Sequence, residues 1–239
     1  MSKKSFHVTC ENCGTRHKSL FSDLGANDLQ TLDQHKNCLT YKKGQIIFYE
    51  GTRPMGLYCI NYGKVKVYKT SAEGKDHIIS FGKPGDFLGY RALLSEEFYA
   101  ASAQVIQEAA VCYIPKKDFF DVLQKNQGLF ARLAKDACHK LGIMEDRLLN
   151  LAQKTVRERL ASTLIMLRET YGMEGDESFV IDLMLTREDL ANIVGTATET
   201  LIRLLSEFRN EKIISFDGKK IVINNMDKLL KEADLYHVS

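Results

Sequence analysis

Residues 185–214 read LTREDLANIVGTATETLIRLLSEFRNEKII. This segment predicts two short amphipathic helices with a tight break at Gly195-Thr196, because glycine adopts dihedral angles that other residues avoid. Thr196 or Thr198 is expected to cap the second helix. The apolar residues expected to face the core are Leu190, Ala191 and Val194 in the first helix, and Leu201, Leu204, Leu205 and Phe208 in the second.

A β-hairpin follows the second helix. Residues 213–216 and 220–223 are rich in isoleucine and flank Asp217-Gly218, a dipeptide favoured in tight turns. Two helices followed by a two-stranded wing are the layout of a winged helix-turn-helix, whose second helix lies in the major groove of DNA. An ordinary helical hairpin would show the same helical periodicity, so the wing and the threonines before the second helix are what favours DNA binding.

The outward side of the second helix carries residue types that read DNA bases. Arg203 can form a bidentate pair with guanine, and Glu199 can accept from cytosine. Because they lie four residues apart, these two side chains can also brace each other. Thr198 and Thr200 are interpreted as cap and phosphate contacts. The full set of expected DNA-contacting residues is Thr186, Arg187, Thr198, Glu199, Thr200, Ile202, Arg203, Ser206 and Lys219.

These motifs resemble a known family. The segment Thr186-Arg187-Glu-Asp-Leu-Ala, the Val-Gly195 pair and Glu199-Thr200-x-x-Arg203-Leu-Leu are similar to the recognition motif of the CRP/FNR family of bacterial transcription regulators. The family places Glu199 and Arg203 on the G·C pair of a TTGA- or TGTGA-like half-site. FNR-type proteins carry serine where this chain has Ile202, so an apolar contact with a thymine methyl is expected there.

The likeness extends to the N-terminal half. Gly51, Gly63-Lys64-Val65, residues 84–89 (PGDFLG) and Ile114-Pro115 resemble landmarks of the cyclic-nucleotide-binding β-roll. The resemblance implies an α+β protein in three parts. These are an N-terminal arm and β-roll (jelly roll) sensor over 1–127, a long dimerisation helix over 128–153, and a C-terminal winged helix-turn-helix over 154–239.

The residues of the N-terminal half independently indicate β-structure. Short β-like segments separated by glycine-bearing turns predict a sandwich or jelly roll. The expected strands are 45–49, 56–60, 64–68, 77–81, 102–106 and 110–114, after a short helical pattern over 21–32.

The resemblance also implies where an effector would bind. Nucleotide binders of the family carry a Gly-Glu pair for the ribose and an Arg-Ser or Arg-Thr pair for the cyclic phosphate. The matching positions here are Gly89-Tyr90 and Ala101-Ser102, so the carboxylate and the arginine are both missing. Without a guanidinium to clamp a buried phosphate, we expect no cAMP binding, with nearby Arg91 the residue to test.

A heptad pattern follows the β-like region. Apolar residues recur at alternating spacings of four and three, namely Phe130, Ala134, Ala137, Leu141, Met144, Leu148 and Leu151. Such a seam favours a two-stranded dimer contact, although a single helix packed on its own domain also shows an apolar stripe. The family dimerises through a helix at this place, so a homodimer is expected.

The cysteines raise the question of a cofactor. FNR-type members bind a [4Fe–4S] cluster through C-x2-C-x5-C in the arm and one cysteine in the β-roll. Cys10, Cys13 and Cys112 match three of these positions, but the remaining position is Ser19, a poor substitute for a thiolate. Cys10, Cys13 and Cys112 are therefore redox candidates, and no cofactor or metal is predicted.

Three interpretations of Cys10 and Cys13 stay open. They are unused thiols of the arm, a dithiol redox switch, or ligands of a metal or cluster completed by His17, Cys38 or Cys112. Cys59 and Cys138 lie on apolar faces and are expected in the core.

Composition sets the remaining bounds. The 239 residues, 44% of them hydrophobic, suffice for one large or two ordinary domains. No run reaches the roughly 18 apolar residues of a membrane span, and no signal peptide is evident, so a cytoplasmic protein with mostly reduced cysteines is expected. Residues 154–239 hold 12 Lys and Arg against 15 Asp and Glu, so any basic DNA-binding face must be local.

These patterns predict a homodimeric transcription regulator that binds a palindromic site on double-stranded DNA, contacts RNA polymerase and answers to a small-molecule or redox signal. Walker loops, dinucleotide fingerprints and paired catalytic residues are not found in the sequence, so no enzyme is predicted. The alternative is a nucleotide- or small-ligand-binding regulatory module without DNA function, which would not need the C-terminal domain.

Overall fold

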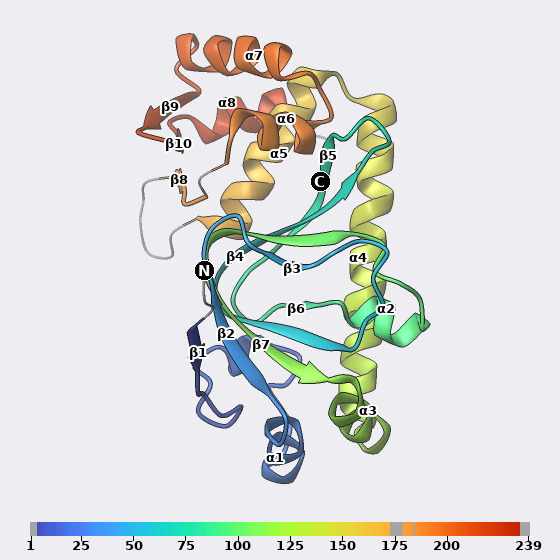
Figure 1. Cartoon of the computed structure of the whole chain (residues 1–239). Coiled ribbons are helices and arrows are strands. Elements are labelled where there is room, and N and C mark those ends of the chain that lie inside the picture. The colour runs from blue at the N-terminus through green and yellow to red at the C-terminus, as the bar shows by residue number, and fades with distance from the viewer. Residues whose placement is uncertain (1–3, 173–178, 184, 235–239) are drawn as a thin grey trace. The chain divides into compact units, whose positions relative to one another are not determined.

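The computed structural model describes residues 4–172, 179–183 and 185–234 (Figure 1). The chain divides into two compact units, Met1–Leu141 and Gly142–Ser239. The long helix α4, Gln127–Gln153, begins in the first unit and ends in the second. Each unit contains its own secondary structure and its own buried residues, and the two are described separately below.

The first unit is built on an antiparallel sheet. Within the described residues it has seven strands, in which β1-β2-β7-β4-β5 form a continuous path, β3 pairs with β7, and β6 pairs with β4. The strands are β1 Lys4–Phe6, β2 Asn37–Tyr41, β3 Ile46–Phe48, β4 Gly56–Thr70, β5 Asp76–Gly82, β6 Phe87–Leu88 and β7 Ser102–Pro115. The predicted β-roll is confirmed.

Two strands are longer than the sequence predicts. Segments 56–60 and 64–68 form the single strand β4, and segments 102–106 and 110–114 form β7. The pairing of β4 with β7 shifts register on both sides of Tyr62, which marks a bulge rather than a turn. Gly63 has a φ of 88°, and a Cβ there would lie 2.2 Å from the Glu108 carbonyl oxygen. Glycine is needed at this position because β4 and β7 approach each other too closely for a side chain to fit between them.

Short helices cover the sheet of the first unit. They are η1 Arg16–Lys18, α1 Ala26–Asp33, α2 Tyr90–Ser95 and α3 Lys116–Lys125. One hydrophobic cluster joins the arm, α1, α3 and the start of α4, and includes Phe21, Leu29, Leu57, Phe119 and Leu133. A second cluster fills the interior of the roll and includes Phe48, Ile60, Val65, Tyr99 and Val111.

Helix α4 leaves its predicted seam uncovered in the single chain. Of its described residues, Leu129 and Leu133 are buried. The large seam residues are exposed, with Phe130 at 57%, Leu141 at 60%, Leu148 at 68% and Leu151 at 52%. The expectation that Cys138 lies in the core is wrong, because it sits three residues before Leu141 on a part of the helix that this chain does not cover.

Besides the end of α4, the second unit contains four helices and a small sheet, counted over its described residues. The helices are α5 Val156–Tyr171, α6 Arg187–Val194, α7 Thr198–Asn210 and α8 Met226–Glu232. The sheet has the order β8-β10-β9, with β8 Phe179–Ile181, β9 Ile214–Asp217 and β10 Lys220–Ile223. The predicted helix-turn-helix and wing are confirmed, and β8 is an additional strand.

The domain predicted over 154–239 includes residues 173–178, 184 and 235–239, which lie outside the described residues. In the portion of the chain with described structure, no helix has both the length and the apolar character needed to cross a membrane.

Candidate nucleic-acid interface and sensor cavity

Helix α6 begins at a capping box. The Thr186 hydroxyl accepts from the main-chain N–H of Asp189 at 2.9 Å, and the Asp189 carboxylate accepts from the N–H of Thr186 at 3.2 Å. The Thr186 hydroxyl also donates to the same carboxylate at 2.7 Å. These reciprocal bonds satisfy donors that a helix start leaves unpaired. Thr186, a predicted DNA contact, thus has a structural role within its own helix.

Helix α6 ends at the predicted glycine. Gly195 takes φ 72° and ψ 51°, the left-handed conformation that glycine adopts without a Cβ penalty. Arg159 of α5 then holds this end of the helix. Its guanidinium donates from Nε to the Val194 carbonyl oxygen at 2.9 Å and from Nη1 to that of Lys154 at 2.8 Å. The role of Arg159 was not predicted, because its partners at the end of α6 lie far along the chain.

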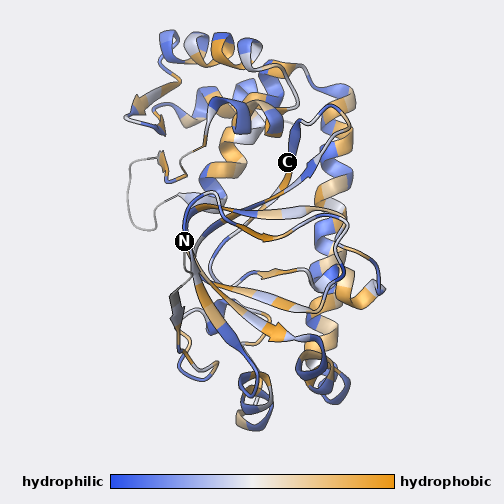
Figure 2. Ribbon diagram, viewed as in Figure 1, coloured by the Kyte–Doolittle hydropathy of each residue, from blue (hydrophilic) through white to orange (hydrophobic). Residues whose placement is uncertain are grey.

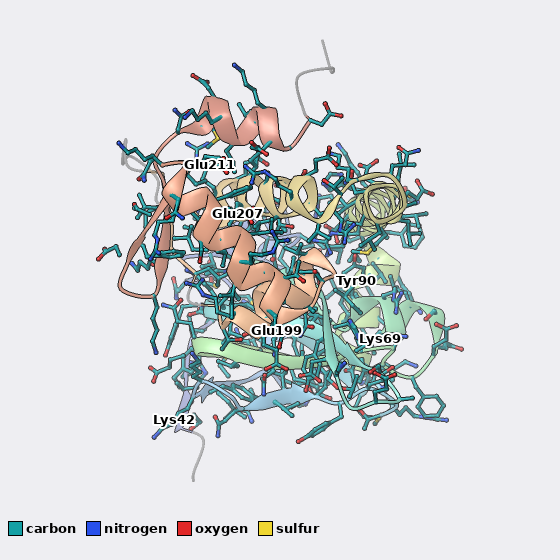
Figure 3. All side chains as sticks on the ribbon, turned by 90° about the horizontal axis from the view of Figure 1, so that it is seen from above. Lys42, Lys69, Tyr90, Glu199, Glu207 and Glu211 are labelled. Atoms are coloured by element: carbon teal, nitrogen blue, oxygen red, sulfur yellow. A yellow bond between two sulfur atoms is a disulfide. The ribbon has the colours of Figure 1, made fainter. Side chains whose placement is uncertain are left out.

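Helix α7 has the two faces that its sequence predicts. Leu201, Leu204, Leu205 and Phe208 are buried. Glu199, Ile202 and Arg203 are exposed. Figure 2 shows hydrophobic and hydrophilic residues alternating around the turns of this helix. Figure 3 labels Glu199, Glu207 and Glu211 along it, from its first turn to its end.

The start of α7 differs from the prediction. Its N-cap is Ala197, which makes no side-chain cap, and Thr198 is the first helical residue. The expectation that Thr196 or Thr198 caps the helix is therefore wrong. The chain enters α7 directly from the Gly195 turn, so the N-cap position falls between the two threonines. Thr200 is half-buried, and the Ser206 hydroxyl donates to the Ile202 carbonyl oxygen at 3.0 Å.

Arg203 is braced by a different glutamate from the one predicted. Its Nη1 donates to Glu207 Oε1 at 2.5 Å, rather than to Glu199. Both glutamates lie four residues from Arg203, so helical spacing alone does not choose between them. The choice follows from Arg157 of α5, which binds the other oxygen of Glu207 and holds that carboxylate in place.

The wing carries one exposed and one paired lysine. Lys219 is exposed beside Gly218, whose φ is 57° in the β9–β10 turn. Lys220 forms an ion pair with Asp182 at 2.7 Å. Arg187 packs its guanidinium 4.6 Å from the centroid of the Phe216 ring, and burial lowers its pKa. Arg187 therefore links α6 to the wing.

The predicted effector residues lie at the start of α2 and at the start of β7. A Cβ on Gly89 would lie 2.9 Å from the Tyr99 ring, so that ring fills the space beside it. The Tyr90 hydroxyl donates to Asp136 at 2.6 Å, and the Ser102 hydroxyl accepts from the N–H of Glu50 at 2.9 Å.

Two further predicted effector residues do not change this arrangement. Arg91 is exposed and Ala101 is half-buried. Two cavities of the first unit are lined by other described residues. One of these cavities is a groove of about 430 Å³ beside Tyr58 and Tyr113, and the other lies among the cysteines.

Three cysteines lie in one row across the sheet. Cys38 on β2 is directly opposite Cys112 on β7, and Cys112 is directly opposite Cys59 on β4. Residues directly opposite in antiparallel strands point to the same face. Cys38 and Cys112 form a disulfide. This disulfide departs from the expectation of mostly reduced cysteines, and it forms because β2, which was not predicted from the sequence, brings Cys38 against Cys112.

A cavity of about 40 Å³ lies over this row, lined in part by Cys10, Cys13, Cys59 and Cys112. Cys10 is buried, and burial raises the pKa of its thiol to about 11 although Lys36 donates to its sulfur at 3.3 Å. Burial alone would raise the pKa of Cys13, but hydrogen bonds with Thr15 and Asn61 outweigh it and lower that pKa. Cys59 is half-buried against the hydrophobic cluster that includes Phe21 and Leu57, and desolvation raises the pKa of its thiol.

The donor set at this cavity does not fit a four-cysteine cluster. The Cys112 sulfur is bonded to Cys38, and the hydroxyl of Ser19 donates to the Arg16 carbonyl oxygen at 2.7 Å. Each iron of a cubane cluster takes a thiolate ligand. Among the residues whose structure is described, no group of three or more His, Cys, Asp or Glu side chains is placed to hold a metal ion.

Comparison with known proteins gives two domain matches. Residues 38–126 match the family model for the cyclic nucleotide-binding domain, and residues 158–232 match that for the Crp-like helix-turn-helix domain. The chain is 31% identical over 232 residues to the "Anaerobic regulatory protein" of Aggregatibacter actinomycetemcomitans, covering 94% of this chain and 87% of that protein.

Two further comparisons span most of the chain. It is 29% identical over 230 residues to the "Fumarate and nitrate reduction regulatory protein" of Escherichia coli K12, covering 95% of this chain and 90% of that protein. The structure of FixK2 from Bradyrhizobium japonicum matches with a TM-score of 0.73 at 25% identity, covering 82% of this chain and 96% of FixK2.

Proposed function

Because the chain belongs to the CRP/FNR family of transcription regulators, which bind DNA through a Crp-like helix-turn-helix, we propose that it binds a palindromic promoter site as a homodimer and reads bases with α7. The alternative of a ligand-binding module without DNA function is wrong, since the helix-turn-helix match covers the C-terminal unit.

The observation that carries the proposal is the exposed face of α7. Its opposite face is fully committed to the core, whereas Glu199, Ile202 and Arg203 are exposed. The Arg203 side chain is 65% exposed. An arginine on such a face can pair with guanine O6 and N7, and Ile202 can contact a thymine methyl. Thr198, Thr200 and Lys219 are assigned to phosphates, which set the register without specifying bases.

The dimer is supported by the uncovered seam of α4. Leu141 and Leu148 are large apolar side chains at heptad spacing, and both are exposed in the single chain. A second copy with the same seam would bury them by knobs-into-holes packing. Two recognition helices related by a two-fold axis read half-sites about one helical turn of DNA apart, which accounts for a palindromic site.

The signal is assigned to the cysteine cavity rather than to cAMP. Cys10, Cys13, Cys59 and Cys112 line one small space, and Cys112 already takes part in a disulfide. Relatives are named for anaerobic regulation and for fumarate and nitrate reduction, which agrees with a redox-linked signal. The signal would act as a population shift, favouring the spacing of the two recognition helices that DNA accepts.

The proposal has three further parts. The protein contacts RNA polymerase at its promoters, works in the cytoplasm where chromosomal DNA is found, and carries out no catalysis of its own. Each follows from its role as a family transcription regulator.

The test is a binding series on single-base variants of a palindromic site selected from random DNA. Arg203→Ala should cost roughly 1–3 kcal/mol per half-site and relax the preference at one base pair. Lys219→Ala is the matched control. It should weaken binding to all sequences alike and lower the salt slope by about one unit. An unchanged base preference in Arg203→Ala would mean that α7 is not the reading helix.

A further inference from the structure

We propose that Glu207 is a positioning residue that determines specificity, because it holds the Arg203 guanidinium ready for guanine while Arg157 holds Glu207. The inference rests on the proposed function, in which Arg203 reads a base. It adds two residues, Glu207 and Arg157, that would not touch the DNA bases themselves.

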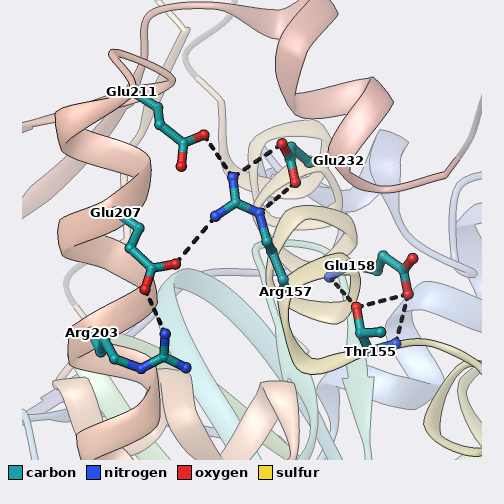
Figure 4. Close-up of polar contacts among 7 residues, drawn as sticks. All are labelled: Thr155, Arg157, Glu158, Arg203, Glu207, Glu211 and Glu232. Carbon is teal, nitrogen blue, oxygen red and sulfur yellow. Dashed lines mark hydrogen bonds and ion pairs between the residues drawn. The ribbon is translucent and has the colours of Figure 1, made fainter.

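Both carboxylate oxygens of Glu207 are occupied. Oε1 accepts from Arg203 Nη1 at 2.5 Å, and Oε2 accepts from Arg157 Nη1 at 3.2 Å (Figure 4). The carboxylate thus bridges two guanidinium groups, one exposed and one largely covered. Charge-assisted bonds of this kind are shorter and stronger than those between neutral groups. Because Arg157 fixes the Glu207 carboxylate, that carboxylate in turn restrains the position of the Arg203 guanidinium.

Arg157 of α5 is held by residues from two other helices, α7 and α8. It extends from the first turn of α5, its Nε donates to Glu232 of α8 at 2.6 Å, and its Nη2 donates to Glu211 at the end of α7 at 2.6 Å. Its guanidinium lies 4.8 Å from the centroid of the Phe208 ring. The bonds with Glu232, and then with Glu211, raise the pKa of Arg157 above its usual range. With so many partners, Arg157 gives Glu207 a fixed anchor.

The bond to Glu207 leaves free the edge of the Arg203 guanidinium that would bind guanine, which is formed by Nε and Nη2. It uses Nη1, and over the described residues Nε and Nη2 of Arg203 have no hydrogen-bond partner. A guanidinium has five N–H donors in a rigid fork, so an edge formed by Nε and Nη2 can meet guanine O6 and N7 while Nη1 stays on Glu207. A solvent-exposed arginine loses side-chain freedom on binding, and a prior contact reduces that loss.

Glu207 also has an electrostatic cost for DNA binding. It brings a negative charge onto the helix that enters the groove, and DNA phosphates repel it. The Glu207 carboxylate is therefore expected to affect base discrimination and overall DNA affinity in opposite directions. It should improve discrimination at the base pair read by Arg203 and weaken binding to DNA of any sequence. A residue with only a structural role would not separate these two quantities in this way.

The chain offers a matched control. Glu211→Gln removes the same charge from the C-cap of the same helix and breaks a contact with the same Arg157, but among the described residues Glu211 is bonded to Arg157 and not to Arg203. The experiment measures dissociation constants of the dimer for three duplexes at two salt concentrations. These are the selected palindrome, the palindrome with the Arg203-dependent base pair changed in both half-sites, and a duplex of random sequence.

Glu207→Gln should raise affinity for the random duplex about twofold to fivefold at low salt, as should Glu211→Gln. Glu207→Gln should also reduce discrimination at the Arg203-dependent base pair by about threefold to tenfold, a part of what a bidentate pair supplies. Glu211→Gln should leave that discrimination unchanged. Glu207→Asp keeps the charge and shortens the reach, so it should lose discrimination without gaining affinity for random DNA.

The variants also separate the inference from the proposed function. In an Arg203→Ala background, Glu207→Gln should no longer alter discrimination. If Arg203→Ala itself leaves the base preference intact, the proposed reader is wrong. If Arg203→Ala removes the preference but Glu207→Gln matches Glu211→Gln, or sharpens discrimination, the positioning role of Glu207 is wrong and the reader stands. Thermal unfolding of each variant checks that it is folded. If Glu207→Gln does not fold, the discrimination measured for Glu207→Asp tests the positioning role instead.

Discussion

Arg159 donates a hydrogen bond from Nη2 to the carbonyl oxygen of Gly195 at 3.0 Å, which joins α5 to the turn between the two DNA-binding helices. Carbonyl groups at a helix end lack partners within the helix and carry partial negative charge, so a guanidinium placed there satisfies and stabilises them. The orientation of α7 relative to α6 therefore depends on a residue outside the helix-turn-helix.

Replacing Arg159 should loosen this turn. Arg159→Met keeps most of the apolar stem but removes the three main-chain contacts, so the free energy of unfolding should fall by about 1–3 kcal/mol. Arg209→Met is the control. Arg209 is exposed near the end of α7. Its replacement should change stability by less than about 0.5 kcal/mol. Urea unfolding of both variants measures the difference, and equal stability of the two would contradict the role given to Arg159.

The seam of α4 predicts the oligomeric state. Replacing Leu141 and Leu148 together by Lys would place charged groups in a contact that a second chain should bury, and burying unpaired charge is costly. Sedimentation should show a dimer for the wild type and a monomer for the double variant. Glu145→Lys is a control on the same helix, since Glu145 is exposed and outside the seam. A wild type that sediments as a monomer at micromolar concentration would refute the dimer.

The helix-turn-helix could be predicted because its determinants are local. The four apolar residues of α7 repeat with the period of a helix, and Gly195 marks the break before them. The contacts that orient the side chains are not local. Arg159 binds Val194, and Arg157 binds Glu232. No periodic pattern in the sequence pairs residues so far apart, so these arginines were missed.

The β-roll shows the same division between local and distant determinants. Alternating residues predicted most strands of the sheet, but β2 owes its conformation to pairing with β7 rather than to a strong pattern of its own. The disulfide between Cys38 and Cys112 depends on that pairing and could not be foreseen. Gly63 looked like a turn residue because turns and bulges both favour glycine, and only the register of β4 distinguishes them.

cAMP is expected not to bind. The Tyr99 ring fills the space beside Gly89, and the Tyr90 hydroxyl donates to the carboxylate of Asp136, which also pairs with Lys140 at 2.8 Å. The family's ribose carboxylate and phosphate arginine are both missing here, because Tyr90 and Ala101 stand in their places. Calorimetric titration with cAMP should give no heat of binding at physiological concentrations. A micromolar or tighter dissociation constant would overturn this expectation, and loss of that binding in Arg91→Ala would identify Arg91 as the phosphate ligand.

Cys13 should be more reactive than Cys10 at neutral pH. The thiolate is the reactive form, and a thiol with a lower pKa reaches it at a lower pH. Hydrogen bonds with Thr15 and Asn61 overcome the effect of burial and lower the pKa of Cys13 below 9.0, whereas burial raises that of Cys10 to about 11. Alkylation with iodoacetamide, followed by mass spectrometry across pH 6 to 11, should therefore modify Cys13 first and Cys10 only near the alkaline end.

The matched variant for this measurement is Asn61→Ala. It removes the amide that donates to the Cys13 sulfur at 3.3 Å, so the pKa of Cys13 should rise and its alkylation profile should move to higher pH. The profile of Cys10 should not move, because its polar neighbours are Asp33 and Lys36. If Cys10 reacts before Cys13 in the wild type, or if Asn61→Ala leaves the Cys13 profile in place, the hydrogen bonds around the cavity do not activate Cys13, and a redox signal would have to enter through another cysteine.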